Sequence, residues 1–305
     1  MHITDIFAAH RPTFSFEFFP PKTAQGAEAL FETARALEPL KPSFVSMTYG
    51  AGGSTRDLTH DLVVRLKQET SLVPMPHLTC VCHSEAEIAD ILGRYAKAGI
   101  SNILALGGDP PRNVENYRRA ADRFQRAADL VGFISDFGKQ RLHPDPRGFG
   151  IGVAGFPEGH PATPNRLQEM DFLKAKVDAG ADFIITQLFF DNHDFLDFRE
   201  RCDVAGIRVP IIAGIMPVQS VEHMARMAEL ASGARYPARL QRAVRRCGED
   251  RDAISRVGIH WATEQCADLI DQGVAGLHFY TLNKSTATLD IYRNLGVQDS
   301  AGLRH

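Results

Sequence analysis

The sequence contains no apolar run long enough to cross a bilayer, although 44% of its 305 residues are hydrophobic. Its start, Met1 to Asp5, lacks the basic region and the apolar core of a secretory signal peptide. We therefore expect a soluble, cytoplasmic protein that has no membrane partner.

Cysteine is scarce and the net charge is low. The five cysteines are odd in number and scattered, which suits a reducing compartment better than a disulfide framework. Cys80 and Cys82 stand close together, but no Cys/His pair follows them at zinc spacing, so we expect no bound metal. The formal net charge is −3, and acidic residues interrupt the arginine-rich stretch 235–256. Both observations argue against a nucleic-acid partner.

Apolar segments of strand length alternate with segments whose apolar residues recur at helical spacing. The expected strands cover residues 14–19, 43–48, 77–81, 102–106, 148–154, 182–187, 210–215 and 276–280. The expected helices include a long charged one over 115–137 and a closing one over 289–295. Strands and helices thus follow each other along the whole chain.

This alternation is typical of an α/β fold of the (β/α)8 type, the TIM barrel. The rival is an open doubly wound sheet, which would need a glycine fingerprint at its first helix, and none stands there. We predict a single TIM-barrel domain over residues 1–305. The apolar helix that holds Phe195 and Phe198 offers an interface, and we expect a homo-oligomer.

The stretch SFEFFPPK, residues 15–22, carries an acid at the end of the first strand. Phenylalanines alternate with Ser15 and Glu17, and Pro20 and Pro21 end the strand because proline cannot donate to the ladder. We expect Glu17 to lie among aromatic rings, where burial favours a protonated carboxylic acid near neutrality. The alternative is an outward-facing Glu17 that pairs with a lysine.

The residues that directly follow the strands of such a barrel line one mouth, where active sites are built. In this chain they are Glu17, Thr48, Asp109, Phe156, Gln187, Met216 and Tyr280, with Lys284 close by. Carboxylates, an amide and a hydroxyl beside glycine-rich turns suit a planar heteroaromatic ligand, because they pair with ring N–H and C=O groups. Any one of these residues could instead cap a loop or face solvent. The prediction depends on their convergence.

Several long motifs follow one another along the chain: SFEFFPPKT, FVSMTYGAGG, PHLTCV, ALGGDPP, GFPEGHP, KVDAGADFIITQLFFD, PIIAGIMPV and LHFYTLNKS. With these motifs, in this order, the sequence resembles the methylenetetrahydrofolate reductase family over nearly its whole length. The resemblance implies a TIM-barrel enzyme that reduces 5,10-methylenetetrahydrofolate to 5-methyltetrahydrofolate with NADH or NADPH, usually through FAD. Because the chain ends shortly after the barrel, we expect no control by adenosylmethionine.

The resemblance also implies roles for individual residues. Glu17 corresponds to the general acid that protonates the departing nitrogen and opens the methylene bridge to a 5-iminium cation. Asp109 corresponds to the acid that holds the pterin and favours that cation. The implied substrate-binding residues are Gln187, His223, Met227, Tyr280 and Lys284. The implied cofactor-binding residues are Thr48, Tyr49, His77, Gly107, Gly108, Asp109, Arg126, Ala127, Phe156, His160, Glu169 and Lys176.

The departures from the family concern the flavin. Gly107 stands where the family usually has an arginine, and Arg126 stands where a cofactor-contacting tyrosine is usual. Arg126, or Arg118 and Arg119, could replace the lost charge so that FAD binds in a shifted pose. Alternatively FAD is not used, and hydride passes directly from the nicotinamide to the iminium. We favour FAD, because most other cofactor positions keep residues of the family's type.

The nicotinamide donor and two rival functions are the remaining alternatives. NADH and NADPH cannot be told apart, because a barrel has no ribose-binding acid at a fixed offset from a glycine fingerprint. A rival function is a pterin-binding methyl-carrier or methyltransferase barrel, and the FEFFPP setting of Glu17 argues against it, since methyl transfer needs no ring opening. An inactive accessory barrel is a further rival, which the intact Glu17, Asp109 and Gln187 argue against.

Overall fold

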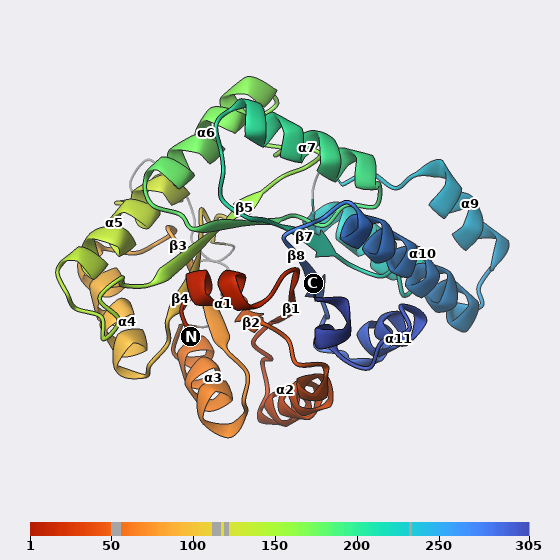
Figure 1. Cartoon of the computed structure of the whole chain (residues 1–305), viewed down its shortest axis with the longest axis horizontal. Helices are drawn as coiled ribbons and strands as arrows, with labels where there is room; N and C mark the ends of the chain where they lie inside the picture. The colour runs from red at the N-terminus through yellow and green to blue at the C-terminus, as the bar shows by residue number, and fades with distance from the viewer. Residues whose placement is uncertain (50–55, 112–116, 119–121, 232–233, 305) are drawn as a thin grey trace.

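The fold is a closed barrel of parallel strands that follow one another in chain order, as predicted (Figure 1). The computed structural model describes residues 1–49, 56–111, 117–118, 122–231 and 234–304. The strands are β1 (Thr13–Phe18), β2 (Phe44–Met47), β3 (Pro74–Thr79), β4 (Asn102–Leu106), β5 (Gly150–Gly155), β6 (Phe183–Thr186), β7 (Ile211–Ile215) and β8 (Gly276–Tyr280). β8 pairs with β1 and closes the ring, so that Ser15 lies opposite His278 and Glu17 opposite Tyr280.

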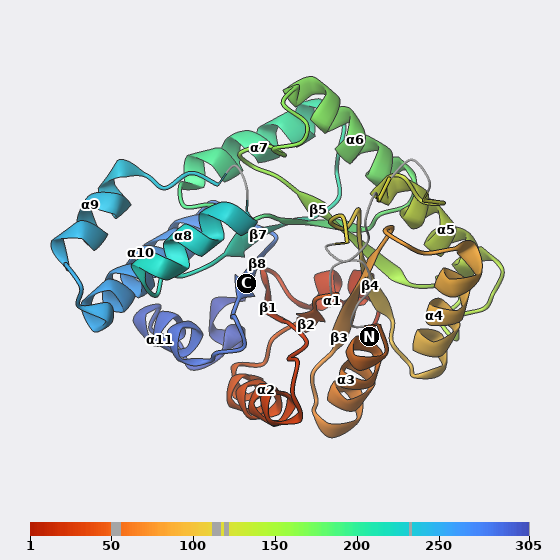
Figure 2. The same cartoon turned by 180° about the vertical axis from the view of Figure 1, so that it is seen from behind.

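Helices follow the strands and form an outer ring, which Figures 1 and 2 show from its two sides. They are α2 (Ala24–Leu37), α3 (Arg56–Glu69), α4 (Glu85–Lys97), α5 (Ala127–Lys139), α6 (Arg166–Asp178), α7 (Asn192–Val204) and α11 (Thr286–Asn294), with 3-10 turns at Glu38–Leu40 and Ser300–Leu303. Between β7 and β8 lie α8 (Val221–Leu230), α9 (Ala238–Arg246) and α10 (Arg251–Asp271). The arginine-rich stretch 235–256 therefore covers α9 and the start of α10.

Side chains alternate between the two faces of each strand, and this divides the core into two parts. Phe14, Phe16 and Phe18 of β1 are fully buried in a cluster with helical residues such as Leu30 and Tyr292. These phenylalanines therefore face outward, between the barrel and its helices. The residues between them face the interior of the barrel.

The interior is apolar at the amino-terminal end of the barrel. Phe44, Phe183 and Ile212 fill it together with Ile3 and Ile6 of α1 (Ile3–Ala9). Helix α1 closes this mouth, and Figure 1 shows it at the centre of the ring of helices. Sequence analysis missed α1, because its 7 residues are too few to show a helical period.

Strand β3 lies earlier in the chain than expected. It begins at Pro74 and ends at Thr79, so the stretch from Cys80 to Cys82 is not a strand. Pro74 and Pro76 oppose residues of β2, whereas β4 pairs with residues 77–79. Prolines are tolerated here because they occupy the part of the strand that precedes the β4 ladder.

The long helix expected over 115–137 is wrong at residues 117–118 and 122–126, whereas 115–116 and 119–121 lie outside the described residues. Helix α5 begins at Ala127, and the described residues between 117 and 126 are not helical. A carboxylate oxygen of Asp129 accepts hydrogen bonds from the backbone N–H groups of Gln125 and Arg126, at 2.9 Å each. These bonds satisfy backbone donors at the start of the helix and fix its first turn.

The expected interface on Phe195 and Phe198 is also wrong. The two side chains are 0% and 1% exposed, respectively. Phe195 stacks on Phe189 with ring centroids 5.4 Å apart, and Phe198 belongs to the main core. Their apolar pattern therefore reports packing against the barrel, and the homo-oligomer stays a prediction without this support.

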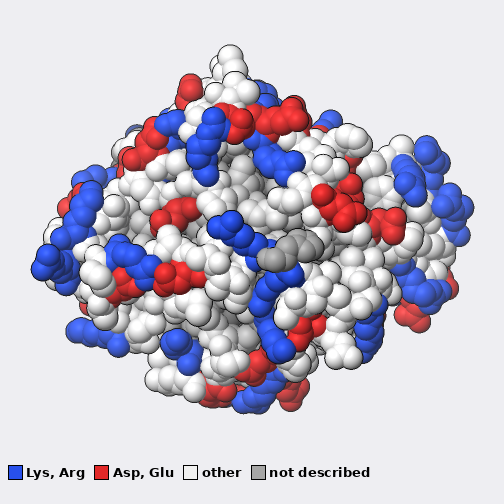
Figure 3. All heavy atoms as spheres, viewed as in Figure 1, with Lys and Arg blue, Asp and Glu red and all other residues white. Residues whose placement is uncertain are grey.

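The surface carries charges of both signs. Figure 3 shows lysine, arginine, aspartate and glutamate side chains interspersed in small groups over the face that carries α1. Among the described helices, none is long and apolar enough to cross a membrane.

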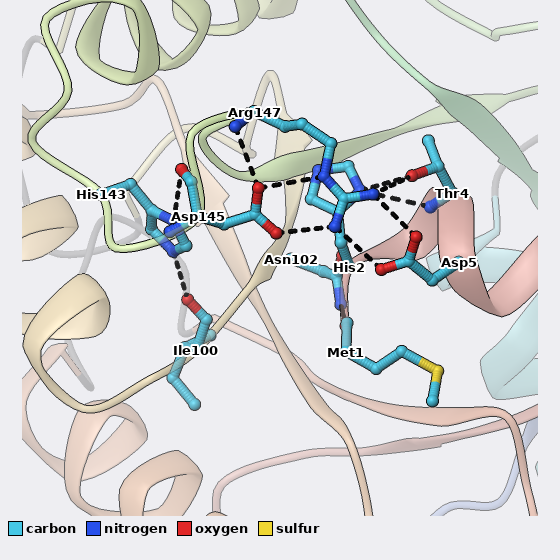
Figure 4. A network of polar contacts seen from close by, with 9 residues as sticks. All are labelled: Met1, His2, Thr4, Asp5, Ile100, Asn102, His143, Asp145 and Arg147. Carbon is cyan, nitrogen blue, oxygen red and sulfur yellow. Dashed lines mark hydrogen bonds and ion pairs between the residues drawn. The ribbon is translucent and has the colours of Figure 1, made fainter.

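Arg147, just before β5, ties α1 to the barrel (Figure 4). Its guanidinium donates to both carboxylate oxygens of Asp5 at 2.7 and 2.8 Å, and to those of Asp145 at 2.7 and 3.0 Å. These hydrogen bonds hold the pKa of Asp145 well below its usual range. Beside them, Asn102 of β4 donates to the Met1 carbonyl at 2.9 Å. The network fastens the amino-terminal plug to the strands that it covers.

Replacing Arg147 by glutamine should lower Tm at pH 7 by about 2 °C, the size expected for a bidentate but largely exposed network. Because the pKa of Asp145 is depressed in the folded protein, its stabilising effect is present above the ordinary carboxyl range and is lost as the pH falls. The difference in Tm between wild type and variant should therefore shrink from about pH 5 downward. Circular dichroism melts over a pH series measure it.

Arg293→Gln is the matched control, since it removes an exposed pair with Asp290 three residues away. It should change Tm by less than about 1 °C. A difference for Arg147→Gln that is the same at pH 7 and in acid would contradict the assignment to this network.

Candidate active site

Glu17, in β1, lies at the carboxyl-terminal mouth of the barrel. Its Oε2 atom is 3.5 Å from Nε2 of His77 and 3.5 Å from Nε2 of His278, and its side chain is 18% exposed. The prediction that Glu17 lies among the phenylalanine rings of the strand is wrong, because Phe16 and Phe18 project from the opposite face. The alternative, an outward Glu17 paired with a lysine, is wrong as well. Two imidazoles lie beside its carboxyl group.

The two histidines come from β3 and β8. His278 is fully buried and His77 is nearly so. Burial lowers the pKa of His77 to about 4, so this residue is neutral near pH 7. The resemblance implied a cofactor role for His77, and the structure brings it to Glu17. Sequence analysis missed His278, although its position two residues before Tyr280 marks it as inward-facing.

The loop after β8 holds the end of β1. The Thr281 hydroxyl donates to the Glu17 carbonyl at 2.6 Å. The Asn283 amide donates to the Phe19 carbonyl at 2.8 Å and accepts from the Phe19 N–H at 2.9 Å. Leu282 and Asn283 have φ of 53° and 56°, a left-handed backbone that asparagine adopts more readily than most residues. Sequence analysis missed this clamp. It holds the loop after β8 against the end of β1, where Glu17 lies.

Tyr280 is predicted to bind substrate, but in the structure its hydroxyl is already hydrogen-bonded to the backbone of β6. The hydroxyl donates to the Thr186 carbonyl at 2.8 Å. Burial, together with the charge of Glu17, raises the pKa of Tyr280 well above its usual range. Gly214 of β7 makes room for this contact, since a Cβ there would lie 2.3 Å from the Thr186 carbonyl oxygen and 2.8 Å from the Tyr280 ring.

Gln187 directly follows β6. Its N–H donates to the Gly155 carbonyl at 2.8 Å, and its Oε1 accepts from the Leu188 N–H at 2.9 Å. The side-chain Nε2 has no hydrogen-bond partner among the residues that the structure describes. An amide donor at the mouth is therefore left for a ligand.

Thr48 and Tyr49 directly follow β2. The Thr48 N–H donates to the Phe18 carbonyl at 2.9 Å, which extends the pairing of β1 and β2 by one residue. The Tyr49 hydroxyl lies 3.1 Å from Nε2 of His83. Both residues therefore reach the mouth next to β1.

Gly107, Gly108 and Asp109 follow β4. Gly108 has a φ of 76°, and a Cβ there would lie 2.8 Å from Thr79, so this turn requires glycine. Asp109 is exposed, and its charge acts on His160, whose pKa is lowered chiefly by burial. The second predicted acid thus lies near the residues that follow β5.

Glu169, Phe172 and Lys176 share one face of α6, three and four residues apart. The Lys176 ammonium donates to the Ala154 carbonyl at 2.5 Å, its one hydrogen-bond partner in the described part of the chain. Burial lowers the pKa of Lys176 to about 8. The charge of Glu169 acts on Lys176 as well, but the one hydrogen bond of the ammonium in the described chain goes to a neutral carbonyl, which leaves it able to bind an anionic group.

Arg126 and His160 add to this face of α6. The Arg126 guanidinium lies 3.8 Å over the Phe172 ring, and Arg126 caps α5 directly before Ala127. His160 packs edge-on against Phe156 with ring centroids 4.6 Å apart. Cationic or imidazole donors and aromatic faces thus lie together. This set fits a cofactor that carries both phosphate groups and planar rings, as FAD does.

Three arginines could replace the charge lost at Gly107. The structure brings Arg126 to α6 through its contact with Phe172. Arg118 lies in a non-helical segment, and Arg119 lies outside the described residues.

The remaining predicted residues lie on the β7 and β8 side. His223, in the first turn of α8, has a buried Nε2 that finds no partner in the described chain. Burial, and next the charge of Lys284, lower the pKa of His223, so these two residues are neighbours. Met227 is 6% exposed and packs in a buried cluster with Met216. His223 and Lys284 therefore form a donor pair, whereas Met227 and Met216 support the mouth from below the surface.

Two cavities open elsewhere on the molecule. One of about 530 Å³ is lined by residues before β7 and β8, such as Asp203 and Arg208. Another of about 300 Å³ lies beside α1 and is lined by His2, Arg147 and Asp182 among others. Neither lining includes a predicted site residue.

The chain is a closed (β/α)8 barrel, and acids, amides and cations gather at its carboxyl-terminal mouth. These features place it in the TIM-barrel class of enzymes. A family model described as methylenetetrahydrofolate reductase matches residues 2–296. The chain belongs to the methylenetetrahydrofolate reductase family.

Individual relatives agree with this assignment. The Arabidopsis thaliana protein named methylenetetrahydrofolate reductase (NADH) 1 is 41% identical over 94% of this chain and 49% of its own length. The Escherichia coli (strain K12) protein named 5,10-methylenetetrahydrofolate reductase is 37% identical over 93% of this chain and 90% of its own. The chain thus spans about half the length of the plant relative and about nine-tenths of the bacterial one.

A solved structure shares the fold. It is described as an uncharacterized protein from Clostridium thermocellum that binds two copies of 5-methyl-5,6,7,8-tetrahydrofolic acid. The TM-score is 0.60 at 15% identity, covering 95% of this chain and 96% of that one. At this identity the likeness concerns the architecture alone.

Replacing Gly214 by alanine should lower the free energy of unfolding by about 1–3 kcal/mol, because the new methyl group overlaps the Thr186 carbonyl and the Tyr280 ring. Urea unfolding followed by circular dichroism measures it. Gly132→Ala in α5 is the control, since nothing lies within 4 Å of the added Cβ, and it should stabilise by about 0.5–1 kcal/mol. Equal stability of Gly214→Ala and wild type would contradict the close contact.

Proposed function

We propose that this chain reduces 5,10-methylenetetrahydrofolate to 5-methyltetrahydrofolate with a nicotinamide donor. The family assignment supports the reaction, and one observation of the structure carries the mechanism. Glu17 lies at the mouth, partly exposed, with its carboxyl group against two buried imidazoles. We also propose that the protein acts in the cytoplasm and that its reaction partners are small molecules. The family assignment also favours reduction over a methyl-carrier barrel.

Glu17 acts as the general acid. The methylene group bridges two nitrogens of the folate, and it accepts hydride only after one of its C–N bonds has opened. Glu17 gives its proton to the departing nitrogen, which leaves an iminium cation at the other nitrogen. Asp109, exposed at the same mouth, supplies a negative charge that favours the cation. That Glu17 is protonated before this step stays a prediction.

The other proposed substrate contacts come from the segments that follow β6, β7 and β8. Gln187 offers its Nε2 donor, and His223 offers a buried Nε2 that has no other partner in the described chain. Lys284, beside His223, adds a positive charge for the acidic part of a folate. Lysine keeps the charge of the arginine that a relative carries here but lacks its bidentate fork. Tyr280 and Met227 serve as walls.

FAD is proposed as the hydride relay between the nicotinamide and the folate. Lys176, His160 and Arg126 would hold its phosphates, and Phe156 would lie against a ring. The name of the Arabidopsis relative specifies NADH, which supports NADH as the donor. The alternative is direct hydride transfer from the nicotinamide, which Gly107 and the Arg126–Phe172 contact leave open.

Replacing Glu17 by glutamine tests the acid. Turnover of methylenetetrahydrofolate should fall about 10²–10⁴-fold, the range for loss of a positioned proton donor. NADH oxidation in the presence of the folate measures kcat and KM. Glu32→Gln on the exposed face of α2 is the matched control and should leave both constants unchanged. Turnover of Glu17→Gln within a few-fold of wild type would remove Glu17 from this role.

Replacing Lys176 by methionine tests the cofactor site. The affinity for FAD should fall about 10–100-fold, because one charged hydrogen bond is lost. Riboflavin, which has no phosphate, should bind to both proteins equally. Because the pKa of Lys176 is about 8, its charge is present below that pH and is lost above it. Wild-type affinity for FAD should therefore fall between about pH 7 and pH 9, and the variant should show no such fall. Quenching of flavin fluorescence measures binding without reference to activity.

Lys174→Met is the control for this variant, since Lys174 pairs with Asp178 on the same helix. It should bind FAD as wild type does. Equal loss of FAD and riboflavin in Lys176→Met would point to damaged packing instead of a lost phosphate contact. A protein that binds no flavin and still turns over would establish direct transfer.

A further inference from the structure

Thr79 ends β3 and carries a buried hydroxyl group that makes no hydrogen bond within the described chain. Its Oγ1 atom is enclosed, and the residue as a whole is 6% exposed. Among the described residues it is the only side-chain hydroxyl in this condition. Burial of a hydroxyl without a partner costs free energy, so such a group is expected to meet a ligand or an ordered water. The proposed reaction gives Thr79 no role so far.

The side chain of Thr79 belongs to the inner face of the barrel, at its carboxyl-terminal mouth. Side chains alternate along β3, where Met75 packs in the interior cluster and Leu78 in the outer one. His77 is also inward, since its Nε2 lies 3.5 Å from Oε2 of Glu17. Thr79 follows His77 by two residues and shares its face. It is the last residue of the strand, and therefore the one of this face nearest to the mouth.

The turn after β4 packs against the methyl side of Thr79. A Cβ built on Gly108 would lie 2.8 Å from Cβ and 3.2 Å from Cγ2 of Thr79, and Oγ1 is not among its nearest atoms. Threonine branches at Cβ, so a methyl group held on one side leaves the hydroxyl on another. The Thr79 hydroxyl is therefore directed away from its contact with Gly108.

Thr79 stands on the side of the mouth where the proposed cofactor residues lie. It pairs with Leu106 of β4, and around the ring β3 is nearer to β5 than to β6 or β8. The cations proposed for the FAD phosphates follow β5 or lie at α5 and α6, outside the ring of strands. An inward group at the end of a strand therefore meets the part of the cofactor that reaches into the mouth. That part is the ring system, since hydride must pass from it to the folate beside Glu17.

We propose that the Thr79 hydroxyl donates a hydrogen bond to the planar ring of FAD, as a further cofactor-binding residue. This inference rests on the proposed role of FAD. The edge of a flavin ring carries carbonyl oxygens and ring nitrogens that accept hydrogen bonds, and a hydroxyl that has no other partner can donate to one of them. The contact fixes the position of the ring. It involves neither a charged side chain nor the phosphates of the cofactor.

Thr79→Val and Thr79→Ser separate the hydroxyl from the methyl group. Valine has nearly the same shape but no hydroxyl, so the affinity for FAD should fall about 3–30-fold as the ring loses a hydrogen bond. Riboflavin should lose the same factor, in contrast to Lys176→Met, because both flavins carry the ring. Thr79→Ser keeps the hydroxyl and should bind both flavins within about threefold of wild type. Quenching of flavin fluorescence by the full chain measures these affinities.

The stability of the flavin-free protein should change in the opposite order. Thr79→Val removes a buried hydroxyl that has no partner in the described chain, so Tm should rise by about 1–3 °C. Thr79→Ser removes the methyl group that packs against Gly108, so Tm should fall by about the same amount. A residue that served the fold alone would not gain stability while it loses affinity for flavin. Circular dichroism melts measure Tm.

Thr263→Val is the matched control. The Thr263 hydroxyl is buried in α10, away from the mouth, and donates to the Ile259 carbonyl at 2.8 Å. Because a satisfied hydrogen bond is lost, this variant should have a lower Tm. It should bind FAD and riboflavin as wild type does.

Unchanged flavin affinity in Thr79→Val would overturn the proposal and make water the partner of the hydroxyl. Equal losses in Thr79→Val and Thr79→Ser would overturn it as well, because packing would then be the cause. A lower Tm for Thr79→Val would contradict a hydroxyl without a partner in the free protein. A wild-type chain that binds neither FAD nor riboflavin would overturn the FAD relay and this contact together, whereas the other outcomes leave the relay intact.

Discussion

Closure of the eight strands into one ring is the constraint on which the rest of this structure depends. Inward side chains have no solvent around them except at the two ends, so polar groups are costly anywhere else in the interior. The amino-terminal end meets this constraint with Phe44, Phe183 and the plug helix α1. The polar groups Ser46, His278 and Glu17 lie toward the other mouth, where a ligand or solvent can complete their hydrogen bonds.

Space inside the ring is limited too. β5 contributes Gly152, where a Cβ would lie 2.5 Å from the Phe183 ring, and β7 contributes Gly214 under Tyr280. These glycines let large rings from neighbouring strands occupy the interior. The rings in turn fix the orientation of polar residues such as His278, which packs between Phe44 and Tyr280. The geometry of the acid therefore depends on apolar contacts that carry no chemistry of their own.

Most strands and helices could be predicted from the sequence. Apolar residues recur every two residues in a half-buried strand and every 3.6 residues in a helix, and this period shows which face is buried. β4 and β8 have the predicted bounds, and the position of Glu17 follows from the end of β1. What could not be predicted depends on contacts between distant segments. The Asn283 clamp joins positions 264 residues apart. Packing against the barrel holds α1, and hydrogen bonds to Asp129 fix the first turn of α5. The direction of the Phe195 face also depends on packing, since an apolar stripe is the same in a core and at an interface.

The two halves of the proposed chemistry come from different parts of the barrel. Glu17, His77 and His278 belong to β1, β3 and β8, whereas Lys176, Arg126 and Phe172 stand on α5 and α6, beside β5. The acid is built inside the barrel, where a single substitution meets several fixed neighbours. The residues proposed to hold the cofactor phosphates stand on helices and loops, where Arg126 stacks on Phe172. On the proposed mechanism, the residues that deliver the proton are therefore held by the closed ring, whereas those that would hold the cofactor phosphates are not.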